Sequence, residues 1–174
     1  MSPAPPAEDA GHGARLRLGL GLAAAVLALD QATKWWILEV VRLPEVGRVY
    51  VLPFMNLTMV WNRGVTFGLF AGDAWWHAYA LAAVALAVAA FLIGWLARAE
   101  DRWTAIALGL VLSGAVGNVI DRLRFGAVVD FVDLHAFGWH WYVFNIADSA
   151  IVCGVGLLLA HALMRPKPER KGEE

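Results

Sequence analysis

Two aspartates, Asp130 and Asp148, lie in segments that are otherwise strongly apolar. Asp130 belongs to the sequence VVDF, and Asp148 stands near the start of the run FNIADSAIVCGVGLLLA. A carboxylate in such surroundings needs a polar partner or loses its charge. If the chain brings the two together they cannot both ionise easily, so the pair shares a proton. Such a pair activates water in aspartic proteases, whereas carboxylates in transporters relay protons, and the spacing alone fits both classes.

Two further pairs of polar residues are spaced four apart, Asp30 with Lys34 and Asn118 with Arg122. On a helix the members of each pair lie on one face and can interact. Opposite charges that pair at membrane depth avoid part of the cost of burial, so we expect Asp30 and Lys34 to form a structural ion pair. Arg122 either extends its charge to the membrane surface or contributes to a functional site, and its spacing fits both roles.

The composition indicates the elements that must position these residues. The chain of 174 residues is 60% hydrophobic and 17% charged, with a mean hydropathy of +0.59. Ordinary soluble domains are about 45–50% apolar and about 25% charged, so this is the composition of a membrane protein. The net charge of -1 gives no sign of nucleic-acid binding. A helix needs roughly 20 apolar residues to cross a bilayer, and four stretches qualify: 16–41, 74–97, 103–122 and 144–164.

The distribution of Lys and Arg predicts the orientation of these spans. Basic residues stand before the first span, between the second and the third, and after the fourth. Segments of this kind remain in the cytoplasm, so both termini are expected inside the cell. We expect one domain over 15–165, with disordered tails at 1–14 and 166–174 because these are rich in Pro, Gly and charge.

The two segments expected outside the cell, 46–70 and 126–144, are rich in β-branched and aromatic residues and are punctuated by Pro and Gly. This pattern favours short strands. The predicted fold is therefore an all-α membrane protein, a bundle of four transmembrane helices, with a small extracytoplasmic β-cradle and a short lid segment.

Other chemistries have weaker support in the sequence. Cys153 is the only cysteine and lies in an apolar run, so neither an intrachain disulfide nor a thiolate metal site is expected. His135 and His140 lack a ligand cluster, and no metal or other cofactor is expected. A serine mechanism would need Ser113 or Ser149 beside a base, and nothing in the sequence places the only lysine of the spans next to either.

Five motifs occur in order around the four spans: DQATK at 30–34, NRGVTFG at 62–68, GAVGNVIDR at 114–122, VVDF at 128–131 and FNIAD at 144–148. Together they resemble the bacterial lipoprotein signal peptidases, also called type II signal peptidases. The resemblance extends from about residue 16 to residue 164. Thr66 stands where a small alanine is commoner in that family.

The resemblance implies an activity and a set of site residues. It makes Asp130 and Asp148 the catalytic pair of an aspartic endopeptidase. The other positions that match the family's site are Asn62, Gly64, Asn118, Arg122, Asn145 and Ala147, while Asp30 and Lys34 match a structural polar pair. The implied substrate is a prolipoprotein whose cysteine carries a diacylglyceryl group, cut just before that cysteine in the bacterial inner membrane. The implied partners are this substrate and membrane lipid, with no nucleic acid, no cofactor and a monomeric chain.

A small proton-coupled transporter is the main alternative, with the same carboxylates as its relay. The two halves of the chain show no repeat and no pair of broken helices of the kind that such folds use. An intramembrane protease of the presenilin type is a second alternative, but GAVVD lacks the second glycine of the Gly-x-Gly-Asp motif. A scaffold without activity would not need two carboxylates at the mouth of the bundle. Within the pair, we expect Asp148 to carry the negative charge, because a helix N-terminus stabilises it.

Overall fold

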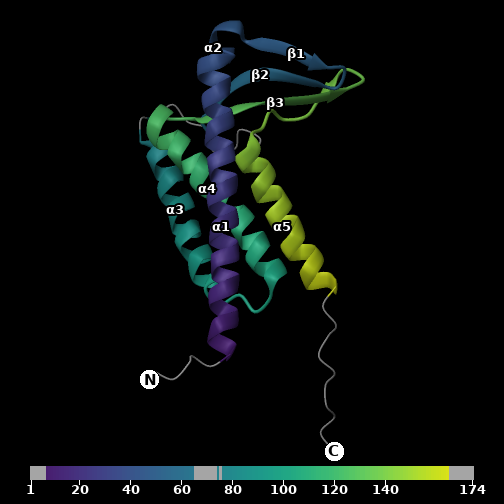
Figure 1. Cartoon of the computed structure of the whole chain (residues 1–174). Helices are drawn as coiled ribbons and strands as arrows, with labels where there is room; N and C mark the ends of the chain where they lie inside the picture. Colours follow the sequence, from purple (N-terminus) through teal and green to yellow (C-terminus); the bar gives the residue numbers. More distant parts are fainter. Residues whose placement is uncertain (1–6, 65–73, 75, 165–174) are drawn as a thin grey trace, which may run out of the picture.

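Four long helices run side by side in the computed structural model, which describes residues 7–64, 74 and 76–164 (Figure 1). They are α1 (Ala7–Trp35), α3 (His77–Leu96), α4 (Arg102–Phe125) and α5 (Ile146–Met164). Helix α1 continues into a π-helical turn, η1 (Trp36–Val40). Among the described residues, four segments are long and apolar enough to span a membrane, and they coincide with the four predicted spans. The predicted four-helix bundle is confirmed.

Helix α1 begins earlier than the sequence analysis predicted. Its first residue is Ala7, inside the segment 1–14 that we expected to be a disordered tail. The prolines of this segment end at Pro6, and the Ala and Glu residues that follow favour a helix. Arg15 then fixes the helix to the rest of the bundle, since its Nε donates a hydrogen bond to the carbonyl oxygen of Ala99 at 2.8 Å. The expected tail at 166–174 lies outside the described residues.

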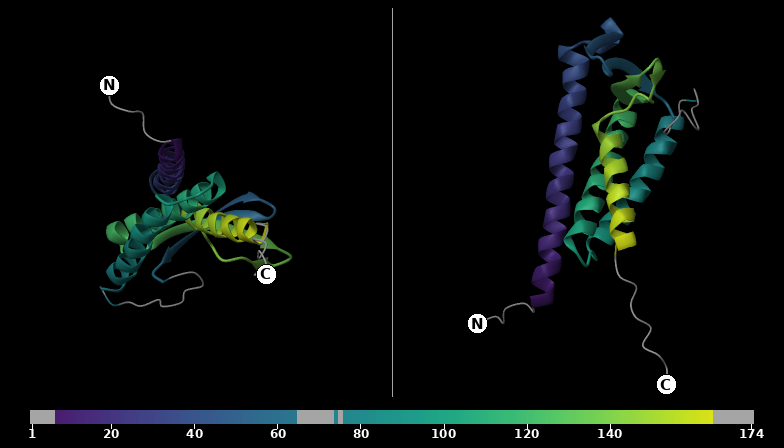
Figure 2. Two further views of the ribbon diagram at one scale, coloured as in Figure 1. Left: turned by 90° about the horizontal axis from the view of Figure 1, so that it is seen from below. Right: turned by 90° about the vertical axis from the view of Figure 1, so that its right-hand side faces the viewer.

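Helix α4 is the centre of the bundle. Within its span 61% of the residues are buried in the protein, against 17–22% in the other three spans. Its close approach to α1 requires glycine, because a Cβ on Gly109 would lie 2.5 Å from the carbonyl oxygen of Gly19. Small residues let helices approach closely within a membrane, where packing drives their association. Figure 2 shows α4 between the other helices when the bundle is seen along its axis.

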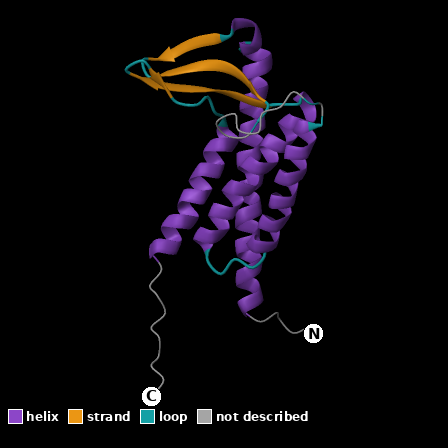
Figure 3. Ribbon diagram, turned by 180° about the vertical axis from the view of Figure 1, so that it is seen from behind, coloured by secondary structure: helices purple, strands orange, loops and turns teal. Residues whose placement is uncertain are grey.

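A small antiparallel sheet lies across one end of the bundle (Figure 3). Its strands follow the order β1 (Arg48–Leu52), β2 (Met55–Asn62), β3 (Val128–Ala136) and β4 (Trp139–His140). The strands expected in the two outer segments are thus confirmed, and the two segments join in one sheet. The lid remains a prediction, and Thr66 lies outside the described residues.

One face of the sheet is covered by η1 and by the short helix α2 (Leu43–Val46). Ile37, Leu43, Val129 and Phe131 form a buried cluster there. Successive side chains of a strand point to opposite faces, so Asp130, between Val129 and Phe131, points to the face away from this cluster. The apolar contacts of its two neighbours therefore fix the direction of the Asp130 carboxylate.

Candidate active site

Asp130 on β3 and Asp148 in the first turn of α5 are joined through one side chain, that of Asn145. Its Nδ2 donates a hydrogen bond to Oδ1 of Asp130 at 2.6 Å, and its Oδ1 accepts one from the backbone N–H of Asp148 at 2.9 Å. Asp148 in turn accepts a hydrogen bond from the backbone N–H of Asn145 at 3.3 Å. Asn145 precedes the first helical residue, so this reciprocal exchange is a capping box. The capping box that begins α5 therefore also brings the two carboxyl groups to one site.

Two more asparagines donate hydrogen bonds to the other oxygens of the two carboxylates. Asn62, at the end of β2, donates to Oδ2 of Asp130 at 3.0 Å. Asn118, on α4, donates to Oδ1 of Asp148 at 2.8 Å, and its own Oδ1 accepts from Asn145 at 3.3 Å. Each oxygen of the pair therefore has an amide donor, which restricts both carboxyl groups to one orientation. The structure brings together the two aspartates and the three asparagines that the sequence predicted.

Burial changes the acidity of Asp130, which is 1% exposed. Burial, and after it the charge of Asp148, raise the pKa of Asp130 to about 7. The hydrogen bonds from Asn62 and Asn145 and the charge of Lys34 act in the opposite direction. Near neutral pH the site can therefore hold a proton, as the sequence analysis expected for two neighbouring carboxyl groups.

Arg122 secures the chain segment that carries Asn62. Its Nη2 donates to the carbonyl oxygen of Gly64 at 2.8 Å, and its Nη1 donates to that of Asn118 at 3.3 Å. The backbone N–H of Gly64 donates to Oδ1 of Asn62 at 3.0 Å. Arg122 is only 8% exposed, so its charge does not extend to the membrane surface, which was one of its two expected roles.

Asp30 and Lys34 form the expected ion pair, with 2.9 Å between Lys34 Nζ and Asp30 Oδ2. The sequence analysis missed the third member, Asp121 on α4, whose Oδ2 lies 2.7 Å from the same nitrogen. Asp121 stands three residues after Asn118, which places the two on one helix face and could have indicated a shared role. The predicted site residue Ala147 also contacts this cluster of Asp30, Lys34 and Asp121. Its backbone N–H donates a hydrogen bond to Asp30 Oδ1 at 2.9 Å.

Asp133 on β3 belongs to a separate cluster. It is three residues from Asp130, so its side chain points to the opposite face of the sheet. His140 Nδ1 lies 2.7 Å from Asp133 Oδ1, and Thr58 donates to Oδ2 at 3.0 Å. Burial alone would raise the pKa of Asp133, but hydrogen bonds from His140, Thr58 and Asn56 hold it below its usual value. Asp133 therefore interacts with other side chains of the sheet and is not part of the Asp130 site.

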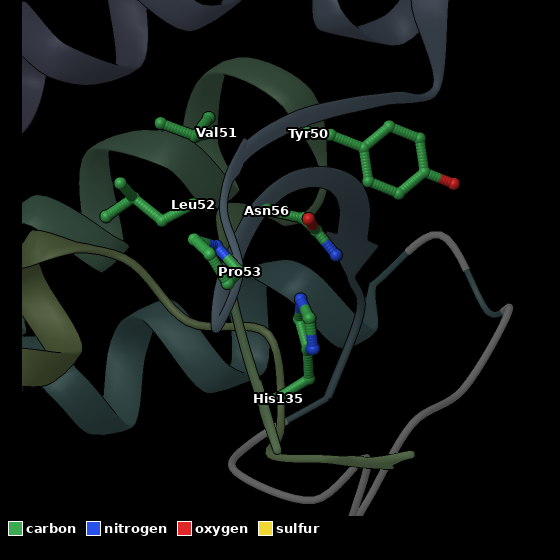
Figure 4. Close-up of a pocket in the computed structure, with 6 residues that line it drawn as sticks. All are labelled: Tyr50, Val51, Leu52, Pro53, Asn56 and His135. Carbon is green, nitrogen blue, oxygen red and sulfur yellow. The ribbon is translucent and has the colours of Figure 1, made fainter. Parts of the chain in front are cut away.

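A hollow of about 360 Å³ adjoins that cluster (Figure 4). The residues that line it are Tyr50, Val51, Leu52, Pro53, Asn56 and His135. His135 is five residues from Asp130 on the same strand, so the hollow is on the other face of the sheet from the two carboxylates. It is not part of the candidate active site.

Comparison with known proteins shows the family to which the chain belongs. The family model described as "Signal peptidase (SPase) II" matches residues 22–164. A lipoprotein signal peptidase of Methylobacterium sp. (strain 4-46) is 51% identical over 148 residues, which are 85% of this chain and 90% of that protein. The lipoprotein signal peptidase of Methylorubrum extorquens (strain PA1) is 48% identical over 152 residues, or 87% of this chain and 88% of its own.

Solved structures show the same fold. A bacterial membrane enzyme determined by the in meso method at 2.3 Å resolution has a TM-score of 0.74 and 28% sequence identity, and the match covers 90% of this chain and 93% of that one. A second such enzyme, determined at 1.9 Å, has a TM-score of 0.72 and 30% identity, with 85% and 94% coverage. Both the family model and the relatives span most of the chain, which is a multi-pass membrane peptidase of the signal peptidase II family.

Proposed function

We propose that the chain is an aspartic endopeptidase that removes the signal peptide from diacylglyceryl-modified prolipoproteins and cuts just before the lipidated cysteine. The observation that carries the proposal is the Asn145 side chain, which bonds both to the Asp130 carboxylate and to the backbone of Asp148. A shared site for two carboxyl groups, one of them protonated near neutral pH, is what water activation by an aspartic pair requires. Membership of the signal peptidase II family supports the same reading.

In the proposed mechanism, ionised Asp148 accepts a proton from a water molecule while protonated Asp130 donates its proton to the scissile carbonyl oxygen. The water oxygen bonds to the carbonyl carbon and forms a neutral tetrahedral diol. Protonated Asp148 then gives its proton to the peptide nitrogen, and the C–N bond breaks as ionised Asp130 takes a proton from one hydroxyl of the diol. The carboxylic acid and the amine leave, and the pair is back in its starting protonation state. The helix N-terminus at Asp148 stabilises its charge before the reaction. Asn62, Asn118 and Asn145 hold the two carboxyl groups throughout.

The position of the site fits a substrate held by lipid. The sheet and the first turn of α5, which carry Asp130 and Asp148, lie at the end of the bundle opposite the start of α1 and the end of α5 (Figure 1). With both termini in the cytoplasm, as the basic residues predict, the site is near the outer leaflet. A diacylglyceryl cysteine anchored in that leaflet presents the preceding peptide bond at the same depth. The proposed location is therefore the bacterial inner membrane, with membrane lipid as a partner and the monomer as the active unit.

The test is cleavage of a diacylglyceryl prolipoprotein peptide by the parent and by the variants Asp130→Asn and Asp148→Asn, with folding checked by thermal melt. We expect both variants to fold and to lose at least about 1000-fold in rate, as removal of a catalytic group does. Asp133→Asn, a buried carboxylate on the other face of the sheet, is the matched control and should keep its activity. Near-parental cleavage by a folded Asp130 or Asp148 variant would exclude that residue from catalysis. A transporter that relays protons through the same pair would not cleave the peptide at all.

A further inference from the structure

We propose that Lys34 is a positioning residue for the reaction, because it anchors two buried carboxylates that each hold the backbone beside one catalytic aspartate. The inference deepens the proposed function and rests on it. Lys34 does not contact either Asp130 or Asp148 by a hydrogen bond within the residues described, so its action is through other groups.

The centre of the arrangement is the Lys34 ammonium group. Its Nζ lies 2.9 Å from Asp30 Oδ2 on its own helix and 2.7 Å from Asp121 Oδ2 on α4. Lys34 is 2% exposed, and each of the two aspartates is 1% exposed. Buried charges of this kind must be paired, so the loss of the cation would leave two carboxylates facing each other without compensation.

Each of these carboxylates also accepts a hydrogen bond from the backbone of a neighbouring element. Asp30 Oδ1 accepts the N–H of Ala147 at 2.9 Å, and Ala147 directly precedes Asp148. Asp121 Oδ2 accepts the N–H of Val129 at 3.1 Å, and Val129 directly precedes Asp130. The two contacts are equivalent, one for each member of the catalytic pair.

Both backbone groups would otherwise lack a partner in the secondary structure. The N–H of Ala147 belongs to the first turn of α5, where a helix offers its own N–H groups no acceptor. Val129 is paired with Trp61 of β2 on one side of β3, and its other side is not covered by β4, which pairs only with His135 and Ala136. The two carboxylates thus fix the start of α5 and the start of β3 relative to each other, with Lys34 between them.

Further contacts join this network to the site. Asn118 Oδ1 lies 3.4 Å from Lys34 Nζ, and Asn118 Nδ2 donates to Asp148. The charge of Lys34 also lowers the pKa of Asp130. Arg122, the second buried cation among the described residues, interacts with the charges of Asp148, Asp121 and Asp130. Removal of Lys34 would therefore disturb both the geometry and the protonation of the pair.

The packing leaves the network little freedom to adjust. A Cβ on Gly117 of α4 would lie 2.6 Å from Oδ2 of Asp30, which is the oxygen bonded to Lys34. Gln31 also links the two carboxylates, because its Nε2 donates a hydrogen bond to Asp30 at 3.1 Å and another to Asp121 at 3.2 Å. The positions of the two carboxylates are set by close contact on several sides, as a positioning role requires.

The first experiment compares Lys34→Met with the parent in the full chain, with rates divided by the folded fraction. We expect kcat to fall by about 100-fold with KM changed by less than about threefold, since small displacements of catalytic groups have effects of this size. The loss of the cation should also move the alkaline limb of the kcat profile to higher pH, because the charge of Lys34 lowers the pKa of Asp130. A role in stability alone would lower the folded fraction but leave the kcat and the pH profile of the folded enzyme unchanged, and that result would overturn the inference.

A second pair of variants keeps the inference testable if Lys34→Met does not fold. Asp30→Asn retains an oxygen that can accept the N–H of Ala147, whereas Asp30→Leu does not. We expect Asp30→Asn to keep kcat within about tenfold and Asp30→Leu to lose about 100-fold. Equal kcat values for the two variants would overturn the inference. Neither result bears on the proposed function, which depends on the separate Asp130→Asn and Asp148→Asn measurements.

Discussion

At the scale of single residues, the site depends on amide side chains more than on charged ones. Asn62, Asn118 and Asn145 each donate to an oxygen of the proposed catalytic pair, within 3.0 Å in all three cases. Amides are neutral and keep their donor groups at every pH, so they orient both carboxyl groups at any pH. The bonds from Asn62 and Asn145 also lower the pKa of Asp130, but burial and the charge of Asp148 outweigh them and leave it raised.

The first prediction concerns the pH dependence of cleavage. Burial and then the charge of Asp148 raise the pKa of Asp130 to about 7, and the mechanism needs this group protonated. We expect kcat/KM to decline as the pH rises above about 7, where Asp130 loses its proton. The measurement is kcat/KM for a diacylglyceryl peptide between about pH 5 and about pH 9. An alkaline limb that is absent over this range would contradict the assignment.

The second prediction follows from the same pKa and concerns stability. Burial and then the charge of Asp148 raise the pKa of the Asp130 carboxyl from 3.8, the value for an unfolded chain, to about 7 in the folded protein. Protonation therefore favours the folded state, and this contribution is complete below about pH 4 and is lost as the pH rises through about 7. We expect the parent to lose roughly 1–3 kcal/mol between pH 5 and pH 8, and Asp130→Asn to lose less. Thermal melts at the two pH values measure the difference, and parallel curves would exclude it.

The third prediction concerns Asn145. Asn145→Ala removes the bond to Asp130 and the cap of α5, so we expect cleavage to fall by about 100-fold and stability by about 0.5–2 kcal/mol. Asn56→Ala is the matched control, since Asn56 is also buried but faces the other side of the sheet. It should leave kcat unchanged. Equal kcat in both variants would show that Asn145 does not position the pair.

At the scale of elements, close helix contacts bring the site residues together. The contact between α1 and α4 places Lys34 beside Asp121, and the contact between α4 and α5 places Asn118 beside Asp148. Both contacts run through glycines and alanines, which leave the backbones near each other. A short sheet then brings β3 onto the end of the bundle, so that Asp130 meets the start of α5.

The fourth prediction tests this packing with two glycines of α1. A Cβ on Gly19 would lie 2.5 Å from the side chain of Leu96 and 2.8 Å from the backbone oxygen of Ala105, whereas one on Gly21 would meet nothing within 4 Å. We expect Gly19→Ala to destabilise the protein by about 1–3 kcal/mol through overpacking. Gly21→Ala should be neutral or slightly stabilising, because alanine favours the helix. Thermal melts in the same detergent compare the two, and an equal Tm would contradict the contact.

At the scale of the whole molecule, the bundle has two different ends. One end carries the sheet and the first turn of α5, and the other carries the start of α1, the end of α5 and the α3–α4 link. Asp101 fixes that link, because its side chain caps α4 and also lies 3.1 Å from His161 of α5. Hydrogen bonds from the backbone and side chain of Thr104, with a smaller effect of His161, outweigh the burial of Asp101 and lower its pKa to about 2, so that the cap of α4 is ionised at physiological pH.

The fifth prediction concerns orientation. In a Cys153→Ala background, Tyr50→Cys on the exposed strand β1 should react with a membrane-impermeant thiol reagent added outside intact cells. Glu174→Cys at the C-terminus should react only after the inner membrane is opened. The opposite pattern would reverse the proposed topology and place the catalytic pair on the cytoplasmic side.

Much of the fold followed from local properties of the sequence. A run of about 20 apolar residues has few ways to satisfy its backbone in a bilayer, so each span was predictable without knowledge of its neighbours. The outer strands were predictable from β-branched residues and turn signals. The start of α1 was not, because the proline-rich composition of segment 1–14 as a whole obscured the helix-favouring residues after Pro6.

The sequence by itself determined most of the candidate site residues, since carboxylates and amides in apolar segments are costly unless they have a role. Only the tertiary structure decided how they are joined. Asp121 is about ninety residues along the chain from both Lys34 and Gln31, which it contacts. Asp130 and Asp133 lie on the same strand, and their side chains point to opposite faces of the sheet. Such contacts depend on how helices and strands pack, and no local pattern records the relative placement of elements distant in the chain.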